Sequence, residues 1–363
     1  MGSRWIARRY QPGDEVQIVD LRRLVFGDRD RRRNTERYWR WEFRDNPSGG
    51  GRIWLAVAEG TIVGQYAVIP VRMQYRGEVA VATLSLDTMT HPDHRHQGVF
   101  TTLANSLYKE LETEKIPVTY GFPNENSLAG LVSKLDWLYL CSLSVFVKPL
   151  RVSRIVERLI TNRALAFPIK KMSRPLARLL FRPTNAFLHK GREIKWIDRF
   201  DDRMNVFWEQ VASRYRIAVV RDSAYLNWRY FDNPGREYRA LIAEKGGEIL
   251  GYVILRCMEQ FGLRGGMIVD LGSQPDQEPV LRALLAKAER FFKKQRMDLV
   301  ACVINGDEKY MAALRKRGFL VRPGILGLKE WHFGCRLNTP TLDRGFFGDS
   351  SNWFLTFGDT DII

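Results

Sequence analysis

The sequence has few cysteines and no long apolar runs, and both absences narrow the class of protein. Its four cysteines include no Cys-x-x-Cys pair, which argues against a zinc site or a disulfide framework and fits reduced thiols. No apolar run reaches the ~18 residues that a membrane-spanning helix needs. The first residues also lack the apolar stretch of a signal peptide, so we expect a cytoplasmic protein.

Acidic residues are scarce relative to basic ones: 41 Asp and Glu face 57 Lys and Arg, which gives a net charge of +16. Such an excess fits a nucleic-acid surface, an anionic membrane surface or a polyanionic ligand. Residues 148–195 alone, however, hold 13 basic and 2 acidic side chains. Most of the excess therefore belongs to one segment rather than to the whole surface.

The two halves of the chain repeat one pattern. The stretch from Trp41 to Pro47 returns as Trp228 to Pro234, and Leu86-Asp87 returns as Val269-Asp270. The order of such matches is kept while their offset falls only from 187 to 181. A fixed order and spacing indicate an internal duplication. We therefore expect one fold used twice, a connector and a tail, with boundaries at 1–148, 149–193 (basic and helical), 194–335 and 336–363.

Hydrophobic periodicity in the first copy predicts both helices and strands. The helices are expected at 14–26, 35–44, 98–115 and 127–135. The strands are expected at 52–59, 61–69, 79–90, 118–122 and 144–147. This order predicts an α/β fold in which helices pack on a mixed sheet.

The strand over 79–90 runs into a short loop, from His91 to Gly98, and then directly into a helix. Such a junction presents free backbone N–H groups and a helix N-terminus, which together bind phosphate. Gly98 permits close approach of the backbone, and Arg95 adds a positive charge. His91, His94 and His96 have no carboxylate at a standard metal-ligand spacing, so we expect phosphate contacts or surface positions for them and no metal.

These residues resemble the GCN5-related N-acetyltransferase (GNAT) superfamily, in particular its tandem-domain branch. The acetyl-CoA motif of that superfamily, Q/R-x-x-G-x-G/A, is matched by Arg95 to Phe100, with Phe100 in place of the final small residue. The stretches 87–92 and 121–127 also resemble that branch. The resemblance implies two tandem GNAT-like domains and transfer of an acetyl group from acetyl-CoA, as cosubstrate, to a primary amine. It implies direct attack in a ternary complex and a small-molecule acceptor, such as an amino sugar or a surface-glycan precursor.

The resemblance implies a cofactor site in the first copy. The strand residues of this site are expected to pair their backbone with the pantetheine arm, in a splay between the fourth and fifth strands. In the second copy, residues 277–280 stand where the loop would lie, without glycine and with Glu278, whose charge repels phosphate. The implied cofactor-binding residues are Thr88, Met89, Thr90, Arg95, His96, Gln97, Gly98, Val99, Phe100 and Asn124.

Two carboxylates are candidates for the base that accepts the proton of the amine, Asp87 and Glu125. The alternative for Asp87 is a structural carboxylate, since Asp270 holds the same place in the second copy, and the alternative for Glu125 is a solvated loop acid. The tyrosine that the superfamily often uses as acid corresponds to Val132. We therefore expect the acid elsewhere, at Tyr120, at Tyr139 or at the C-terminal carboxylate of a tail that docks between the halves.

Four residues are candidates for contact with the acceptor. Trp39 and Arg40 lie on the second expected helix, which borders the acceptor site in the superfamily. Tyr120 and Asn126 lie on and after the fifth strand. The alternative for the aromatic residues is burial in the core, as we expect for the repeated Trp41 and Trp228.

The connector has apolar helical stripes with Arg side chains around them over 150–190. We expect it to pack on the neighbouring domains, with peripheral contact to the inner face of an anionic membrane as the second interpretation. Nucleic acid ranks third, because no aromatic platform or known motif supports it. Two other functions stay open: a tRNA-dependent aminoacyl transferase of the tandem type, and a membrane-associated scaffold without catalysis. The oligomeric state is not indicated.

Overall fold

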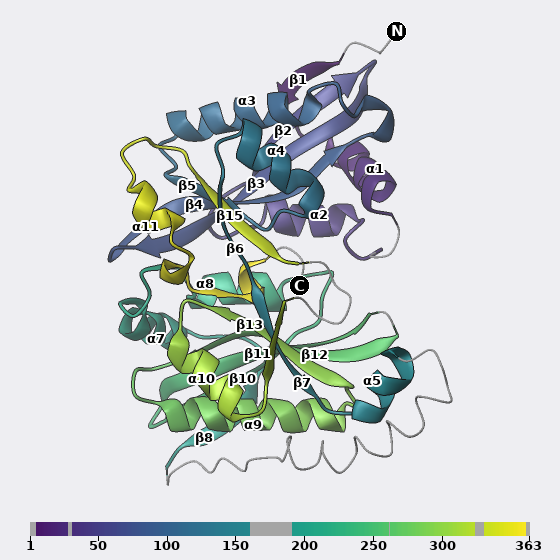
Figure 1. Cartoon of the computed structure of the whole chain (residues 1–363). Coiled ribbons are helices and arrows are strands. Elements are labelled where there is room, and N and C mark those ends of the chain that lie inside the picture. Colours follow the sequence, from purple (N-terminus) through teal and green to yellow (C-terminus); the bar gives the residue numbers. More distant parts are fainter. Residues whose placement is uncertain (1–4, 28–30, 160–190, 261, 324–329, 361–363) are drawn as a thin grey trace.

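The computed structural model describes residues 5–27, 31–159, 191–260, 262–323 and 330–360. It shows two mixed sheets, each covered by helices, stacked one above the other (Figure 1). The α/β class and the two tandem copies that the sequence predicts are confirmed. Most of the basic connector, 160–190, and the chain end, 361–363, lie outside the described residues. None of the described helices is both long and apolar enough to cross a membrane.

The sheet of the N-terminal unit has the order β1-β2-β3-β4-β5-β15-β6, with β9 paired to the far end of β3. Its strands are β1 Ile6–Arg9, β2 Arg52–Ala58, β3 Thr61–Tyr75, β4 Glu78–Thr90, β5 Val118–Gly121, β6 Leu138–Ser142, β9 Ile217–Val219 and β15 His332–Leu337. Its helices are α1 Glu15–Phe26 and α2 Glu36–Phe43, which share one hydrophobic core, and α3 Val99–Thr113 and α4 Glu125–Lys134, which share another.

The sheet of the C-terminal unit has the order β14-β7-β13-β12-β11-β10-β8, with β16 paired to β13. Its strands are β7 Ser144–Pro149, β8 Glu193–Ile197, β10 Arg239–Lys245, β11 Glu248–Gln260, β12 Leu263–Ser273, β13 Leu299–Asn305, β14 Leu320–Pro323 and β16 Leu355–Thr356. The helices of this part of the chain are α5 Val152–Leu159, α7 Arg203–Ala212, α8 Ser223–Leu226, α9 Glu278–Lys294, α10 Glu308–Lys316 and α11 Arg344–Gly348.

The two units exchange their last strands. β7, which the sequence groups with the first copy, pairs with β13 and β14 of the C-terminal unit. β15, from the end of the second copy, lies between β5 and β6 of the N-terminal unit. Each exchanged strand covers a strand edge that would otherwise stay open. The boundaries expected at 148 and 335 therefore separate the sequence copies but not the two sheets.

Two tryptophans that repeat in the sequence meet at the centre of the interface. The rings of Trp41 and Trp228 stack with centroids 5.1 Å apart. Each indole N–H donates to the main-chain oxygen of the other tryptophan, at 2.8 Å and 2.9 Å. The expected burial of both residues is confirmed, and this reciprocal contact is the pattern of a two-fold interface.

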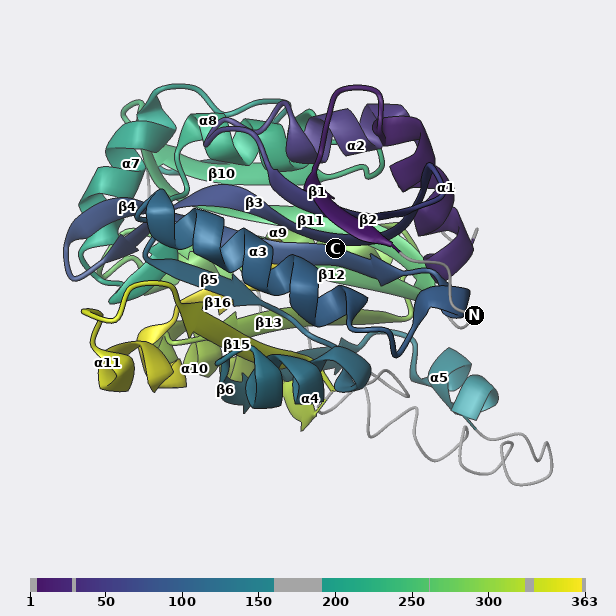
Figure 2. The same cartoon turned by 90° about the horizontal axis from the view of Figure 1, so that it is seen from above.

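The C-terminal tail docks between the units, as the sequence predicts from its aromatic residues. Trp353, Phe354, Leu355 and Phe357 are buried. The strand β16 of this tail lies beside β13, with which it pairs (Figure 2). Ordering a tail costs conformational entropy, and burial of these large side chains offsets that cost.

Candidate active site

A bulge interrupts the long strand β4 at Asp87. In the pairing with β3, Gln65 faces Met89 but Ala67 faces Leu86, so that two residues of β4 lie opposite one residue of β3. Asp87 has a φ of 49°, a left-handed conformation that residues other than glycine rarely adopt. The Gln65 side chain donates to the main-chain oxygen of Asp87 at 3.0 Å and holds the bulge. Bulges of this kind re-aim a strand and often lie beside active sites.

Beyond the bulge, β4 separates from β5. The two strands pair in parallel only where Thr83, Leu84 and Ser85 face residues 119–121, where β5 ends. β4 continues to Thr90 without this neighbour. The expected splay between the fourth and fifth strands is therefore present. We call the gap between the end of β4 and the segment after β5 the cofactor slot.

The loop after β4 presents free N–H groups at the start of α3. His96 and Gly98 both have left-handed backbones, with φ of 62° and 78°. The side chain of Gln97 donates to the main-chain oxygen of Asp93 at 3.0 Å and fixes the loop. Within the described chain, the N–H groups of His96, Gln97 and Gly98 have no hydrogen-bond partner. With the first N–H groups of α3 they form the expected cradle for an anion, and the exposed Arg95 lies beside it.

Phe100 replaces the small residue that the superfamily motif has at this position, and its ring points away from the cradle. The ring centroid lies 5.7 Å from that of Tyr66. A Cβ on Gly130 of α4 would lie only 3.1 Å from the Phe100 ring. The ring thus fills the space between the sheet and α4, and the row of N–H groups stays accessible.

A cavity of about 1160 Å³ joins these features. It extends from the loop after β4, along the slot, to the C-terminal end of α1. Ten residues that the sequence predicts for the site line it together: Asp87, Thr88, Thr90, Arg95, His96, Gly98, Val99, Phe100, Asn124 and Asn126.

Two further residues expected at the cofactor do not line the cavity with their side chains. The Met89 side chain is buried in the core below β4, so that only the Met89 backbone can contact a ligand in the slot. The side chain of Gln97 is used within the loop, as described above. Both positions are compatible with contact through the backbone.

The structure places four other predicted residues away from the cavity lining. Glu125 is exposed in the first turn of α4. Trp39 is buried between Tyr10 and Phe43, and the exposed Arg40 pairs with Glu36. Tyr120 is fully buried and faces the tail, with its ring centroid 6.0 Å from that of Trp353. Trp39 and Tyr120 thus have the core positions that were the alternative for aromatic residues.

The part of the cavity farthest along the chain from the loop after β4 is lined by α1 and by the segment before α2. Two of these residues, Arg22 and Arg33, hold Asp87: the Arg22 guanidinium lies 2.7 Å and the Arg33 guanidinium 3.6 Å from its carboxylate. Both arginines also lie within 3.7 Å of Glu42. Sequence reasoning missed this cluster. Its signal was Arg22, which follows Ile18, Val19 and Leu21 on the buried face of α1.

The floor of the cavity carries a chain of hydroxyl groups. The indole N–H of Trp137 donates to the Tyr108 hydroxyl at 2.7 Å, and the Tyr108 and Tyr66 hydroxyls are hydrogen-bonded. Ser85 Oγ lies 3.4 Å from the Tyr66 hydroxyl. Burial raises the pKa of Tyr66 and that of Tyr108, so both stay protonated at neutral pH. The Trp137 indole N–H and the Ser85 hydroxyl therefore both donate into this chain, and Tyr66, Ser85 and Trp137 line the cavity.

Neither of the two tyrosines considered as the acid, Tyr120 and Tyr139, lines the cavity, and Tyr120 is buried against the tail as described above. Val132 is exposed, and Tyr139 is exposed on the edge strand β6. The C-terminal carboxylate lies outside the described residues. Among the residues that the structure does describe, no three His, Cys, Asp or Glu side chains are grouped as a metal site.

Comparisons with protein families and with solved structures show which proteins this chain resembles. Residues 7–139 match the model of an acetyltransferase (GNAT) domain. A comparison with curated proteins found no match.

Among solved structures, the chain resembles a probable N-acyltransferase from Enterococcus faecalis, with a TM-score of 0.63 over 92% of this chain and 73% of that one. It resembles a GCN5-related N-acetyltransferase from Anabaena variabilis with a TM-score of 0.62, over 93% of this chain and 73% of that one. It resembles the N-myristoyltransferase of Saccharomyces cerevisiae with bound myristoyl-CoA with a TM-score of 0.59, over 92% and 82%. The identity is 12% in each case, so these likenesses concern the fold, and they cover both units.

Proposed function

Taking residues 7–139 as the GNAT acetyltransferase domain of an acyltransferase that uses an acyl-CoA donor, we propose that this chain acetylates a primary amine of a small molecule with acetyl-CoA. The observation that carries the proposal is the open slot beside the bulge of β4, which ends at the cradle of free N–H groups before α3. Both features belong to one continuous cavity.

The donor fits this cavity in one direction. The N–H groups of residues 96–99 and the Arg95 side chain would hold its pyrophosphate. The backbone of Thr88, Met89 and Thr90, which lacks a strand neighbour on the slot side, would pair with the pantetheine arm. Asn124, the N-cap of α4, lies across the slot. Gly121, at the end of β5, packs against the Trp137 ring, which a Cβ at this position would approach to 3.1 Å.

The reaction requires two proton transfers. The amine nitrogen bonds to the acetyl carbon while the carbon–sulfur bond breaks, so that the nitrogen must lose a proton and the thiolate must gain one. Asp87 is the only carboxylate among the described residues that line the cavity, and we assign it the proton of the amine. The protonated Tyr66 hydroxyl, which lines the cavity beside Ser85, would supply the proton to the thiolate.

The acceptor would enter from the side of α1. Arg22, Arg33 and Asn34 are polar there, while Val25 and Phe26 are apolar. The guanidinium charges are balanced by Asp87 and Glu42, so this side carries little net charge. Such a lining suits a small, polar, uncharged body that bears one amine, for which amino sugars are the first class to test.

The test is release of free CoA thiol from acetyl-CoA in the presence of a panel of primary amines that includes amino sugars. We expect release with at least one amine, and a loss of at least 100-fold in Gly98→Glu, which places a negative charge in the cradle. Gly77→Glu is the matched control, because Gly77 is an exposed glycine with φ 83° at the opposite end of β4. Absence of release with every amine, or equal rates in the two variants, would contradict the proposal.

A further inference from the structure

The C-terminal unit contains a second slot between its central strands. β12 and β13 pair in parallel only from Gly265–Ile268 and Leu299–Cys302. Just beyond, the pairing of β12 with β11 shifts between Ile268 and Asp270 and skips Val269, while that of β4 with β3 shifts at Asp87. Each unit thus has a splay between its central strands and a bulge beside the aspartate that the two copies share. We call the gap in the C-terminal unit the tail slot.

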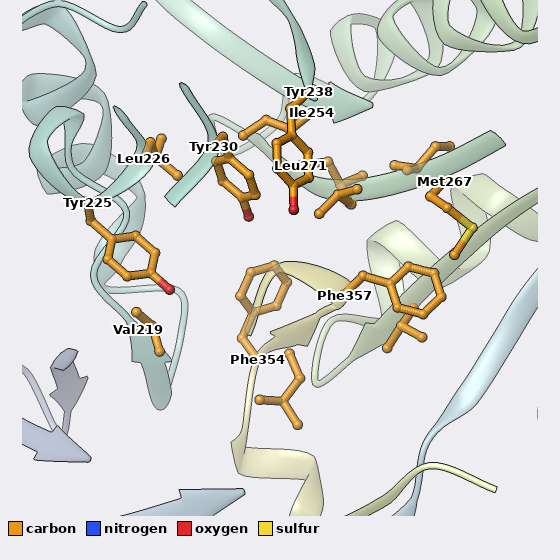
Figure 3. Close-up of a cluster of buried hydrophobic side chains, with 14 of the residues drawn as sticks. Val219, Tyr225, Leu226, Tyr230, Tyr238, Ile254, Met267, Leu271, Phe354 and Phe357 are labelled. Carbon is orange, nitrogen blue, oxygen red and sulfur yellow. The ribbon is translucent and has the colours of Figure 1, made fainter. Parts of the chain in front are cut away.

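The tail slot is filled by the end of the same chain. β16 pairs antiparallel with β13, where Thr356 faces Ile304 and Leu355 faces Asn305. β16 and the following 3-10 turn, Phe357–Asp359, contact both β12 and β13. Phe354 and Phe357 extend into the cluster of buried side chains that includes Tyr225 and Tyr230 (Figure 3). An extended segment of the protein therefore occupies the place that is an open cavity in the N-terminal unit.

Polar groups of the slot recognise the tail at several points. The Asp359 carboxylate accepts from the Arg221 guanidinium of the slot at 2.7 Å and, within the tail, from the N–H of Thr356 at 2.7 Å. Arg221 also contacts both carboxylate oxygens of Asp270 at 3.2 Å. Asn305 donates to the main-chain oxygen of Trp353 at 2.9 Å, and Arg229 donates to that of Gly358 at 3.1 Å. These groups are buried or nearly so, and buried hydrogen bonds to charged groups are strong and directional.

The fit is close enough to exclude a side chain at two glycines. A Cβ on Gly358 of the tail would lie 2.0 Å from the Tyr230 hydroxyl oxygen. A Cβ on Gly306, directly after β13, would lie 2.3 Å from the main-chain oxygen of Trp353. This complementarity is that of a binding site for one particular peptide.

We propose that the C-terminal unit is a peptide-binding module that holds residues 352–360 of its own chain as a ligand, in the position where the N-terminal unit holds its donor. The position of the donor in the N-terminal unit rests on the proposed function, whereas binding of the tail by the C-terminal unit does not. The bound tail also supports the first slot. The Trp353 ring lies against Tyr120 on β5 and against Phe333 on β15, with centroids 6.0 Å and 5.1 Å apart. β5 is one wall of the splay in the N-terminal unit.

The test separates the tail from the body of the folded chain. A recognition sequence for a specific protease is inserted after Pro340, in an exposed turn between β15 and α11. The purified protein is cut, and exchange of its 341–363 fragment for a fluorescent peptide of the same sequence is followed by anisotropy. We expect the cut fragment to stay bound through size-exclusion chromatography and the labelled peptide to replace it slowly. Loss of the fragment on cutting, without binding of the labelled peptide, would overturn the proposal.

Variant peptides show whether binding in the tail slot depends on the sequence of the tail. Gly358→Val is expected to weaken binding at least 100-fold, whereas Ser351→Ala, at an exposed position, should bind within threefold of the parent peptide. Equal binding of Gly358→Val would overturn the proposal.

A measurement on the uncut chain tests the proposal even where the cut protein unfolds. Gly358→Val in the full chain should speed hydrogen exchange of residues 352–360 at least 100-fold, while β11 and α9 stay protected. Unchanged protection of the tail would contradict the proposal. Neither readout uses acyl-CoA, so failure of the proposed function and failure of this inference are distinguishable.

Discussion

Asp87 combines a left-handed backbone with a buried ion pair, and each constraint supports the other. The conformation at a φ of 49° is costly for a residue with a side chain, and the surrounding contacts hold it. The carboxylate contacts Arg22 at 2.7 Å, and the main-chain oxygen accepts from Gln65 at 3.0 Å. Asp270, next to the bulge of the C-terminal unit, likewise forms a buried ion pair, with Arg221. One residue therefore shapes the slot and brings a carboxylate to it.

At this scale, Asp87→Asn separates a catalytic from a structural carboxylate. Removal of one partner from a buried ion-pair network costs about 3 kcal/mol of unfolding free energy. Glu42→Gln is the matched control, because Glu42 belongs to the same network but does not line the cavity. We expect both variants to be destabilised by that amount in urea. Only Asp87→Asn should lose kcat, by about 10²–10⁴-fold, as expected for loss of a general base. An equal loss of kcat in both variants would assign Asp87 a structural role alone.

At the scale of elements, the exchanged strands decide how the two units depend on each other. β6 pairs only with β15 within the described chain, and β15 also covers the edge of β5. β7 likewise lies between β13 and β14. Each unit therefore lacks a strand of its sheet when the other is absent.

A split chain tests this dependence. We expect residues 1–159 expressed alone to aggregate or to stay unfolded, because β5 has an open edge and β6 has no neighbour. Coexpression with residues 160–363 should give a soluble one-to-one complex, as judged by size-exclusion chromatography and light scattering. A monomeric 1–159 fragment with a cooperative thermal transition would show that the exchange is dispensable.

The sequence contains enough information for the elements at the site but not for the exchange. The Val- and Thr-rich strand, the Arg95 to Gly98 loop and the stripe of Leu103, Leu107 and Leu111 predict β4, the cradle and α3 from local patterns, and these are present. The exchange could not be read in this way. β7 and β15 fit either sheet by pattern, and the choice depends on which open edge lies nearest in the folded chain.

The residues of the candidate site likewise fall into those that the sequence predicts and those that only the folded structure reveals. Residues on the slot side follow β4 in the chain and could be named from the sequence. Arg22, Arg33 and Tyr66 come from α1, from the segment before α2 and from β3, and only packing brings them to Asp87 and Ser85. Trp39 and Tyr120 have aromatic side chains that suit a pocket or a core equally, and tertiary packing places both in the core.

At the scale of the whole molecule, many tyrosines are sealed in the two cores. Burial raises the pKa of Tyr38, Tyr66, Tyr108, Tyr120 and Tyr225. A tyrosine ionises near pH 10 in the unfolded chain. Since the folded pKa is higher than the unfolded one, the stability from these groups is complete below pH 10 and is lost as the pH rises above it.

Alkaline titration checks this relation. We expect the absorbance of tyrosinate from these buried residues to appear only together with the loss of far-ultraviolet circular dichroism, in one cooperative step above pH 10. Exposed Tyr139 should titrate before that step. Complete titration of all tyrosines near pH 10 with an intact circular dichroism spectrum would show that the cores admit water.

The central claim is that one chain with two related units holds one donor site, because the slot of the N-terminal unit is open and that of the C-terminal unit is filled by the tail. Calorimetric titration of the full chain with acetyl-CoA tests it directly. We expect one molecule bound per chain, with binding lost in Gly98→Glu and kept in Gly77→Glu. Two molecules bound per chain, no binding at all, or unchanged binding in Gly98→Glu would contradict the account.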